Sequence, residues 1–297
     1  MGGRPALRPR TLTPRRSAAG RGRRASLIAY AAERRDEETQ LSQTQQTAAV
    51  PDDPRHRRHV PFDRLHNFRD LGGYRTAGGR TVAWGRLYRA DSLGKLRGAD
   101  WERFLGLGVR TVVDLRYPWE IEAKGRIPEP DRFTYANHSI EHRPYDQSAI
   151  DPDVDPWRYL ADRFAEVAED GAAEIRQVLE LLAEGPGPAV FHCTSGKDRT
   201  GLIAALVLVL LEVPEEQILA DFALTELATA RLLADWHDAN PGRTMRWPSY
   251  GRAPAAVMSL TLADLATRHG SPTAYLTDRV GITPHTTQLL RERLLVP

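Results

Sequence analysis

Residues 188–213 read PAVFHCTSGKDRTGLIAALVLVLLEV, and this stretch decides the fold around the most reactive side chain. Residues 188–191 form a short apolar run, and residues 202–213 form a longer one. The small and polar residues between them are typical of a tight loop that connects a buried strand to a buried helix. Cys193, the only cysteine in the chain, would lie at the start of that loop, just before the helix N-terminus.

A loop of this kind favours negative charge. Backbone N–H groups and the helix dipole stabilise a bound phosphate there, and they also favour the thiolate of Cys193, the nucleophilic form. Arg199 carries a planar guanidinium that suits phosphate oxygens. We therefore predict that Cys193 attacks a phosphate ester to form a cysteinyl phosphate, while Arg199 binds the phosphate. The other expected phosphate-binding residues are Thr194, Ser195, Gly196, Lys197, Thr200 and Gly201.

The same reaction needs a group that protonates the leaving oxygen and later takes a proton from water. Two carboxylates are catalytic candidates: Asp198 lies inside the loop, and Asp146 follows Pro144 in the loop after a predicted strand. Asp198 also fits a first-turn acid favoured by the helix dipole, and Asp146 also fits an ordinary loop residue. The sequence leaves the choice between them open.

Composition limits the classes of protein that fit. The chain has 297 residues, of which 41% are apolar, and a formal net charge of +2, so it can build a sizeable core and is not strongly basic. A single cysteine excludes an internal disulfide and a cysteine-rich zinc site. We expect no metal, no cofactor and no specific nucleic-acid partner. No apolar run reaches the roughly 18 residues of a membrane span, so we expect no transmembrane segment.

Residues 1–58 differ from the rest. They are rich in Arg, Ser, Thr, Gln and Pro and poor in aromatic and β-branched residues, so they cannot offset the entropy of ordering. They also lack the continuous apolar region of a secretory signal. We interpret them as a disordered basic tail, with weak binding to nucleic acid or anionic lipid as the alternative to a merely solvated segment.

Residues 59–297 alternate between predicted strands and helices and form one domain. Strands are predicted at 81–89, 109–115, 133–140 and up to Cys193. Helical patterns cover 100–106, 118–123, 155–183 and the region after Pro214. Because strands that alternate with helices pair in parallel and are covered on both sides, we predict an α/β fold. Its mostly parallel central sheet is flanked by helices on both faces, with extra helices at the C-terminal end.

The loop resembles the phosphate-binding loop of the atypical bacterial tyrosine phosphatases, with His192 to Gly201 as the matching residues. Other motifs of that family occur in family order over about residues 59–297. They are Asn67-Phe68-Arg69-Asp70, Gly85 to Asp91, Val113 to Arg116 with Glu120, Ala220-Asp221-Phe222, and Tyr275-Leu276 with Gly281-Ile282.

The resemblance implies the cysteine-phosphatase fold and a metal-free, two-step protein tyrosine phosphatase. Members act on phosphotyrosine, often on phosphoserine or phosphothreonine, and in some cases on phosphoinositides. The resemblance also implies that Cys193 is the nucleophile, that Arg199 binds phosphate, and that Lys197 and Asp198 complete the loop. Asp146 falls near the proline-adjacent aspartate of the family.

Three alternatives to a dual-specificity protein phosphatase are considered: a phosphoinositide phosphatase, a sulfurtransferase and a non-catalytic phosphate-binding protein. Sulfurtransferase loops do not require Arg199-Thr200-Gly201, and pseudophosphatases typically lose the cysteine or the arginine, both of which are present. We expect a phosphoprotein or phosphoinositide partner and a cytoplasmic location. Secretion without a recognisable signal peptide, the physiological substrate and the oligomeric state stay open.

Overall fold

Cys193 directly follows the central strand of a five-stranded sheet. The computed structural model describes residues 57–145, 150–151, 153–245, 247 and 249–297. The spatial order of the strands is β1 (Arg69–Asp70), β3 (Leu87–Ala90), β6 (Ala189–His192), β4 (Thr111–Asp114) and β5 (Thr134–Asn137). The last four are parallel to one another, whereas β1 runs antiparallel to β3. The predicted mostly parallel sheet is therefore confirmed.

Successive side chains of each strand point to opposite faces of the sheet and enter two separate cores. On β6, Phe191 enters the larger core, while Val190 enters the smaller one. On β4, Val113 and Val112 divide in the same way. Because both faces are apolar and fully covered, these strands read as continuous hydrophobic runs in the sequence.

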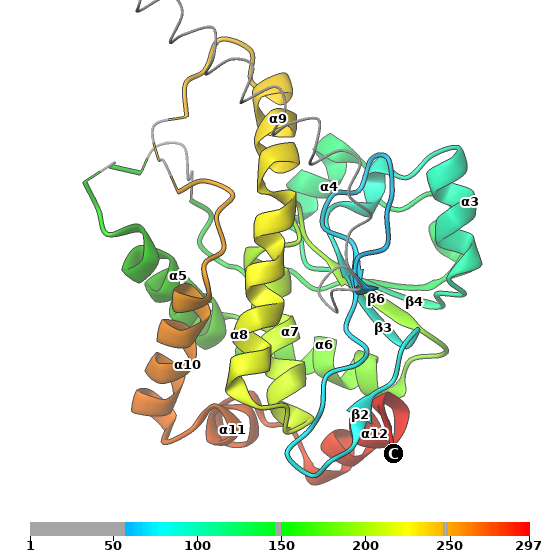
Figure 1. The fold of residues 1–297 in the computed structure, drawn as a ribbon, viewed down its shortest axis with the longest axis vertical. Coiled ribbons are helices and arrows are strands. Elements are labelled where there is room, and N and C mark those ends of the chain that lie inside the picture. Colours follow the sequence, from blue (N-terminus) through cyan, green and yellow to red (C-terminus); the bar gives the residue numbers. More distant parts are fainter. Residues whose placement is uncertain (1–56, 146–149, 152, 246, 248) are drawn as a thin grey trace, which may run out of the picture. The chain divides into compact units, whose positions relative to one another are not determined.

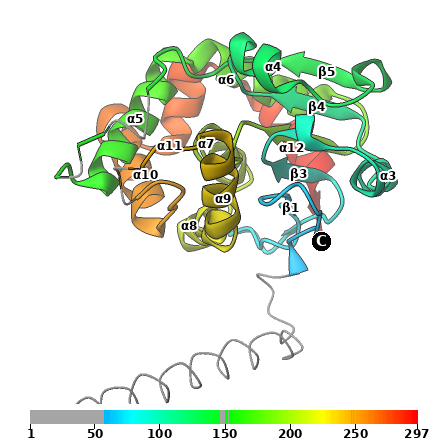
Figure 2. The ribbon, with the colours of Figure 1, turned by 90° about the horizontal axis from the view of Figure 1, so that it is seen from above.

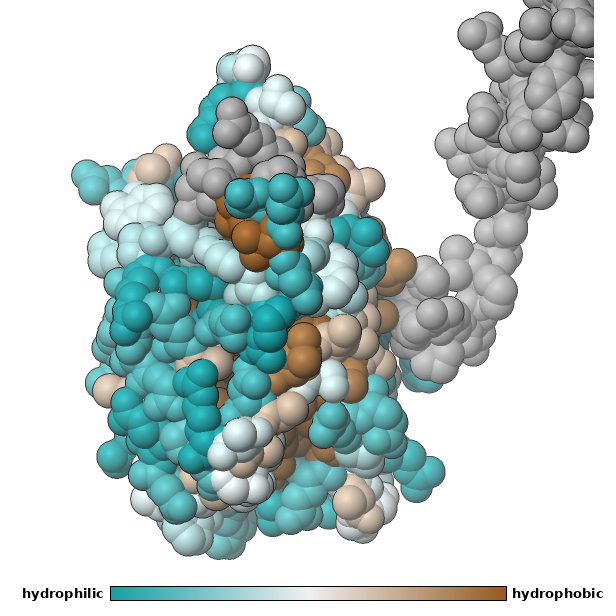
Figure 3. Space-filling view, turned by 90° about the vertical axis from the view of Figure 1, so that its left-hand side faces the viewer, coloured by the Kyte–Doolittle hydropathy of each residue, from teal (hydrophilic) through white to brown (hydrophobic). Residues whose placement is uncertain are grey.

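Helices cover both faces, as predicted. The smaller core is covered by α3 (Ala99–Gly106), and Figures 1 and 2 show this helix on one side of the sheet with α5, α7 and α10 on the other. The larger core is built with α5 (Pro156–Asp170), α6 (Ala172–Glu184), α7 (Asp198–Leu210), α8 (Glu215–Ala223), α10 (Ala255–His269) and α12 (Pro284–Leu294). Polar residues cover most of the outer face on the side of α5 and α10, with small apolar patches between them (Figure 3).

The domain also contains α4 (Pro118–Lys124), α9 (Thr229–Ala239), α11 (Pro272–Ala274), η2 (Leu93–Lys95), η3 (Pro130–Arg132), η5 (Leu224–Ala228) and η6 (Tyr275–Val280). The last strand, β7 (Leu295–Val296), pairs antiparallel with β2 (Thr81–Val82). This pairing ties the C-terminal end of the chain to the segment before β3.

The predicted single strand over 81–89 is wrong. The structure divides it into β2 and β3, which belong to different sheets. Gly85 separates them with a φ of 71°, a left-handed conformation that breaks a strand. The carboxylate of Asp70 holds this turn, because it accepts a hydrogen bond from the Gly85 N–H at 2.6 Å and one from the Gly72 N–H at 2.7 Å.

The predicted tail over residues 1–58 lies outside the described residues except for Arg57 and Arg58, so its disorder stays a prediction. Arg58 is buried, with its guanidinium carbon 3.5 Å from the ring centre of Tyr74. Within the described part of the chain, no helix combines the length and apolar character that crossing a membrane requires.

Candidate active site

The loop between β6 and α7 lies at the carboxyl ends of the parallel strands, where open α/β sheets bind their ligands. Cys193 is its first residue and is 2% exposed. Gly196 in the loop has a φ of 67°, and a Cβ on it would lie 2.6 Å from the backbone carbon and oxygen of Ala90. Only glycine fits this position, so the loop packs directly against the end of β3.

The backbone carbonyls of the loop are held by the surrounding protein. The Asn67 side-chain amide donates to the Ser195 carbonyl at 2.9 Å, and the Arg89 guanidinium donates to the Gly196 carbonyl at 2.8 Å. The Ser92 N–H donates to the Thr194 carbonyl at 3.2 Å. None of the described residues accepts a hydrogen bond from the N–H groups of residues 194–197. These N–H groups thus form a cradle that an anion can fill.

A buried ion cluster supports the residues that hold those carbonyls. The carboxylate of Asp221 on α8 accepts hydrogen bonds from Arg89 at 2.6 Å, from Arg69 at 3.2 Å and from the Tyr74 hydroxyl at 3.2 Å. Burial alone would raise the pKa of Asp221, but the two guanidinium groups outweigh it and lower this pKa to about 2. Arg69 also donates to the side-chain oxygen of Asn67. Residues of three of the motifs, 67–70, 85–91 and 220–222, thereby support the loop.

Arg199 occupies the first turn of α7 and is fixed by acidic neighbours. Its guanidinium donates to both carboxylate oxygens of Glu120, at 2.6 Å and 3.0 Å, and its Nε lies 3.6 Å from Glu141. Burial disfavours the charge, but Glu120, Cys193 and Glu141 outweigh that effect and raise the pKa of Arg199. The Thr194 hydroxyl also donates to Glu120. Arg199 is therefore a permanent cation beside the cysteine loop.

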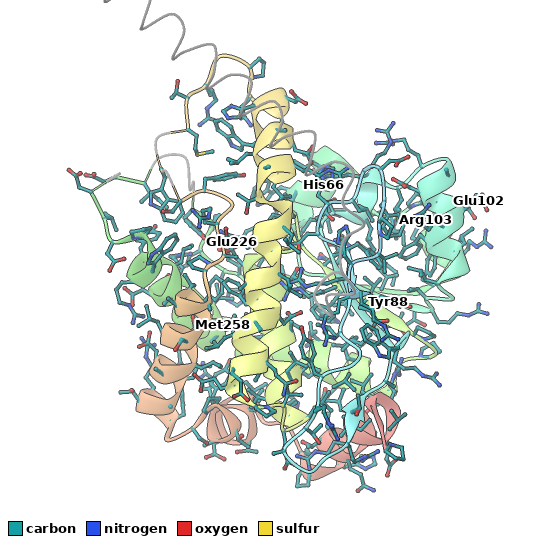
Figure 4. All side chains as sticks on the ribbon, viewed as in Figure 1. His66, Tyr88, Glu102, Arg103, Glu226 and Met258 are labelled. Carbon is teal, nitrogen blue, oxygen red and sulfur yellow. The ribbon has the colours of Figure 1, made fainter. Side chains whose placement is uncertain are left out.

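Lys197 and Asp198 lie together at the C-terminal end of the loop. Lys197 is 2% exposed, and its Nζ lies 3.2 Å from Asp198 Oδ1 and donates to the Arg252 carbonyl at 3.2 Å. Glu226 fixes this second contact by accepting hydrogen bonds from Arg252 and Ala253, both at 2.6 Å. Figure 4 shows Glu226 pointing from the α8–α9 side toward the segment before α10. This ammonium group thus links the loop to a distant segment.

Thr200 and Gly201, the last two predicted phosphate-binding residues, differ in their hydrogen bonding. The hydroxyl of Thr200 is buried and makes no hydrogen bond with any described residue. The N–H of Gly201, in contrast, donates to the Lys197 carbonyl at 2.7 Å and so belongs to the helix. A Cβ on Gly201 would lie 2.8 Å from the Phe222 ring, so close packing is what requires glycine there.

A pocket beside the loop contains a carboxyl group that sequence reasoning missed. It is lined by Glu141, Tyr145, Arg163, Phe164, Val167, Asp198, Arg199 and Leu202. Glu141 follows β5 and is 8% exposed. No local motif marks Glu141 in the sequence, because its burial depends on residues from distant segments. Asp146 lies outside the described residues.

The arrangement combines a cysteine, an anion cradle, a guanidinium and three carboxyl groups, those of Glu120, Glu141 and Asp198, within one site. In the described part of the chain, no three His, Cys, Asp or Glu side chains gather closely enough to hold a metal ion. The groups that are present suit nucleophilic attack on an anionic ester together with proton transfer.

The sequence is similar to those of several known proteins. A protein of Cupriavidus necator named as a candidate tyrosine-protein phosphatase is 35% identical over 69% of this chain and 74% of its own length. A tyrosine-protein phosphatase of Nostoc commune is 29% identical over 69% of this chain and 73% of its own. The triple specificity protein phosphatase PtpB of Mycobacterium tuberculosis is 29% identical over 57% of this chain and 69% of its own.

The tyrosine phosphatase family matches residues 60–296, which contain the loop and the motifs that hold it. This range covers most of the chain and agrees with the resemblance predicted from the sequence. The chain therefore belongs to the tyrosine phosphatase family and is an enzyme of the protein-tyrosine-phosphatase class.

Proposed function

We propose that the protein hydrolyses phosphotyrosine in proteins by a two-step reaction through a cysteinyl phosphate. The observation that carries the proposal is the orientation of the loop over residues 193–199. Because Asn67, Arg89 and Ser92 hold its carbonyls, its N–H groups are left for a phosphate directly beside Cys193.

In the first step the thiolate of Cys193 attacks phosphorus, the S–P bond forms, and the bond to the ester oxygen breaks. In the second step water attacks phosphorus and the thiolate leaves. The N–H groups of residues 194–197 and the fork of Arg199 stabilise the negative charge on the phosphoryl oxygens in both steps. The unpartnered hydroxyl of Thr200 would stabilise the departing sulfur.

The surroundings of Arg199 favour an aromatic substrate. The ring of Tyr117 has its centre 5.5 Å from the Arg199 guanidinium carbon, and Trp119 stacks on Tyr117 with ring centres 5.5 Å apart. Trp119 is 58% exposed, so this aromatic surface reaches solvent beside the phosphate site. A phenol ring gains stacking there that a serine side chain does not. Activity on phosphoserine, phosphothreonine or phosphoinositides stays a prediction of the family resemblance.

The test is turnover of p-nitrophenyl phosphate and a phosphotyrosine peptide by wild type and Cys193→Ser, each with and without a chelator. We expect wild-type turnover that is indifferent to the chelator. The serine variant should be inactive yet still bind the phosphopeptide. Turnover that survives in Cys193→Ser would disprove the mechanism. A wild type that binds the peptide without turnover would point to a non-catalytic reader, and activity confined to thiosulfate and cyanide would point to a sulfurtransferase.

A further inference from the structure

We propose that Glu141 is a catalytic acid and base of this enzyme: it protonates the leaving ester oxygen and then accepts a proton from the attacking water. This assignment rests on the proposed function. It adds a third carboxyl group to the two that the sequence put forward, Asp198 and Asp146.

Glu141 lies beside the cysteine loop. Glu141 lines the pocket beside the loop together with Asp198 and Arg199. Its Oε2 lies 3.6 Å from Nε of Arg199, and Arg199 is the residue expected to hold the phosphate. A carboxyl group so close to the guanidinium that would bind the phosphate would be within reach of an ester oxygen or of one intervening water. The side chain is also 8% exposed, so its proton is shielded from bulk water.

The surroundings of Glu141 favour its protonated form. Burial is the main influence and raises its pKa above the ordinary value for glutamate. Arg199 and Arg163 oppose this effect, whereas Asp198 and Glu120 add to it. The partly buried ring of Tyr117, whose pKa is itself raised by burial and by Glu141, also faces this site. A phosphate dianion at Arg199 would raise the pKa of Glu141 further and so keep its proton in place until transfer.

The neighbouring carboxyl groups of Glu120 and Asp198 are paired with cationic side chains. Glu120 accepts hydrogen bonds from Arg199 and from Thr194, which outweigh its burial and lower its pKa, so it holds no proton to donate. Asp198 is paired with Lys197 at 3.2 Å. Carboxyl groups whose environments push their pKa values apart are the usual basis for dividing acid and charge-stabilising roles. Here the raised pKa belongs to Glu141.

The proton balance of the reaction follows. As the S–P bond forms and the P–O bond breaks, neutral Glu141 gives its proton to the departing oxygen, so that tyrosine leaves as a neutral phenol. The resulting carboxylate then takes a proton from water while the water oxygen attacks phosphorus and the Cys193 thiolate departs. Each turnover therefore returns both Glu141 and Cys193 to their starting forms.

The experiment compares two leaving groups in Glu141→Gln. A general acid matters most for a poor leaving group, and kcat/KM reports the step in which that group departs, so kcat/KM for phenyl phosphate should fall about 100-fold or more and kcat/KM for p-nitrophenyl phosphate much less. The decline of kcat/KM for phenyl phosphate at high pH should also disappear, because that decline reports loss of the acid's proton. Glu120→Gln is the matched control: it also lies at Arg199, and it should lower kcat/KM for both substrates by the same factor.

Equal losses of kcat/KM for both substrates in Glu141→Gln would overturn the assignment. So would selective loss for phenyl phosphate in Asp198→Asn or Asp146→Asn but not in the Glu141 variant. If Glu141→Gln fails to fold, Glu141→Asp keeps a carboxyl group and should keep a finite high-pH decline at a shifted position; an unshifted decline would count against Glu141. Activity of Cys193→Ser reports separately on the proposed function.

Discussion

Glu120 binds the guanidinium of Arg199 with both carboxylate oxygens, Oε2 at 2.6 Å from Nη1 and Oε1 at 3.0 Å from Nη2. The same carboxylate accepts hydrogen bonds from the Thr194 hydroxyl and the Tyr117 N–H. One side chain of α4 thereby aligns the start of the loop with its terminal arginine. Glu120 thus fixes the orientation of the guanidinium that we propose binds the phosphate.

Glu120→Gln should weaken catalysis without removing the phosphate site. The amide keeps the shape of the side chain but loses one charged acceptor, so Arg199 is held less well. A small misplacement of a catalytic group is costly, and we expect kcat/KM to fall on the order of 10- to 100-fold. Steady-state kinetics with p-nitrophenyl phosphate measure this. An unchanged kcat/KM would show that Arg199 needs no such support.

Arg199→Lys should be more damaging. Lysine keeps the charge but has no fork to bind two phosphoryl oxygens, so kcat should fall about 100-fold or more. Binding of inorganic phosphate as an inhibitor, measured in the same assay, should weaken far less, because a charge remains. A near-wild-type kcat would contradict the transition-state role of the guanidinium.

Asp221→Asn should destabilise the fold. It leaves the buried guanidinium groups of Arg69 and Arg89 without their anion, which costs roughly 3–5 kcal/mol of unfolding free energy. Urea unfolding measures this cost. Glu212→Gln is the control, because its pair with Arg291 is exposed and should be worth less than about 1 kcal/mol. Equal losses of unfolding free energy in the two variants would show that the buried cluster stabilises the fold no more than an exposed ion pair does.

The same cluster predicts an acid dependence. The pKa of Asp221 is lowered to about 2 in the folded chain from 3.8, so its ionisation stabilises the fold fully above about pH 4. As the pH falls toward 2, the unfolded chain takes up a proton that the folded chain refuses, and this stabilisation is lost. The difference in unfolding free energy between wild type and Asp221→Asn should therefore be smaller at pH 3 than at pH 6. A difference that grows in acid would contradict this sign.

Gly196→Ala should abolish activity and cost more unfolding free energy than Gly79→Ala. Both glycines have positive φ, 67° and 82°, but a Cβ on Gly196 meets the backbone of Ala90 at 2.6 Å, whereas one on Gly79 meets nothing within 4 Å. Gly79→Ala should lower the unfolding free energy only by the backbone strain of an L residue at positive φ, about 1–2 kcal/mol, and should keep full activity. Thermal and urea unfolding with kinetics on both variants separate strain from contact. Equal losses of unfolding free energy and activity in the two variants would show that close packing of the loop against β3 is not needed for stability or activity.

Trp119→Ala should raise KM for a phosphotyrosine peptide roughly 2- to 10-fold, as expected for loss of one aromatic contact. KM for a phosphoserine peptide should stay unchanged, because that side chain has no ring to stack. Trp84→Ala is the matched control: Trp84 is 41% exposed but packs against Gly72 and Gly73 rather than Tyr117. Parallel changes in KM for both peptides would assign Trp119 to general surface packing.

Local patterns predicted most of the strands and helices, and they failed where a tertiary contact intervened. The alternation over 81–89 favours one strand, yet Asp70 binds the Gly85 N–H and turns the chain there. Asp70 lies 15 residues away in the sequence, so a window of neighbouring residues contains no sign of it. The sequence around Glu141 gives no local sign of a role for the same reason, because distant residues form the pocket that buries its side chain.

Local sequence was enough to predict the strand–loop–helix unit around Cys193, which the structure confirms, and to predict a phosphate chemistry for that loop. These features depend on residue types and spacing within about ten positions, and hydrophobic periodicity and helix capping act over that range. Only the tertiary structure decided which groups support the loop. Arg89 reaches Gly196 across 107 residues, and Glu120 reaches Arg199 across 79. Such contacts depend on which strand ends and helices the fold brings together, and no local propensity encodes them.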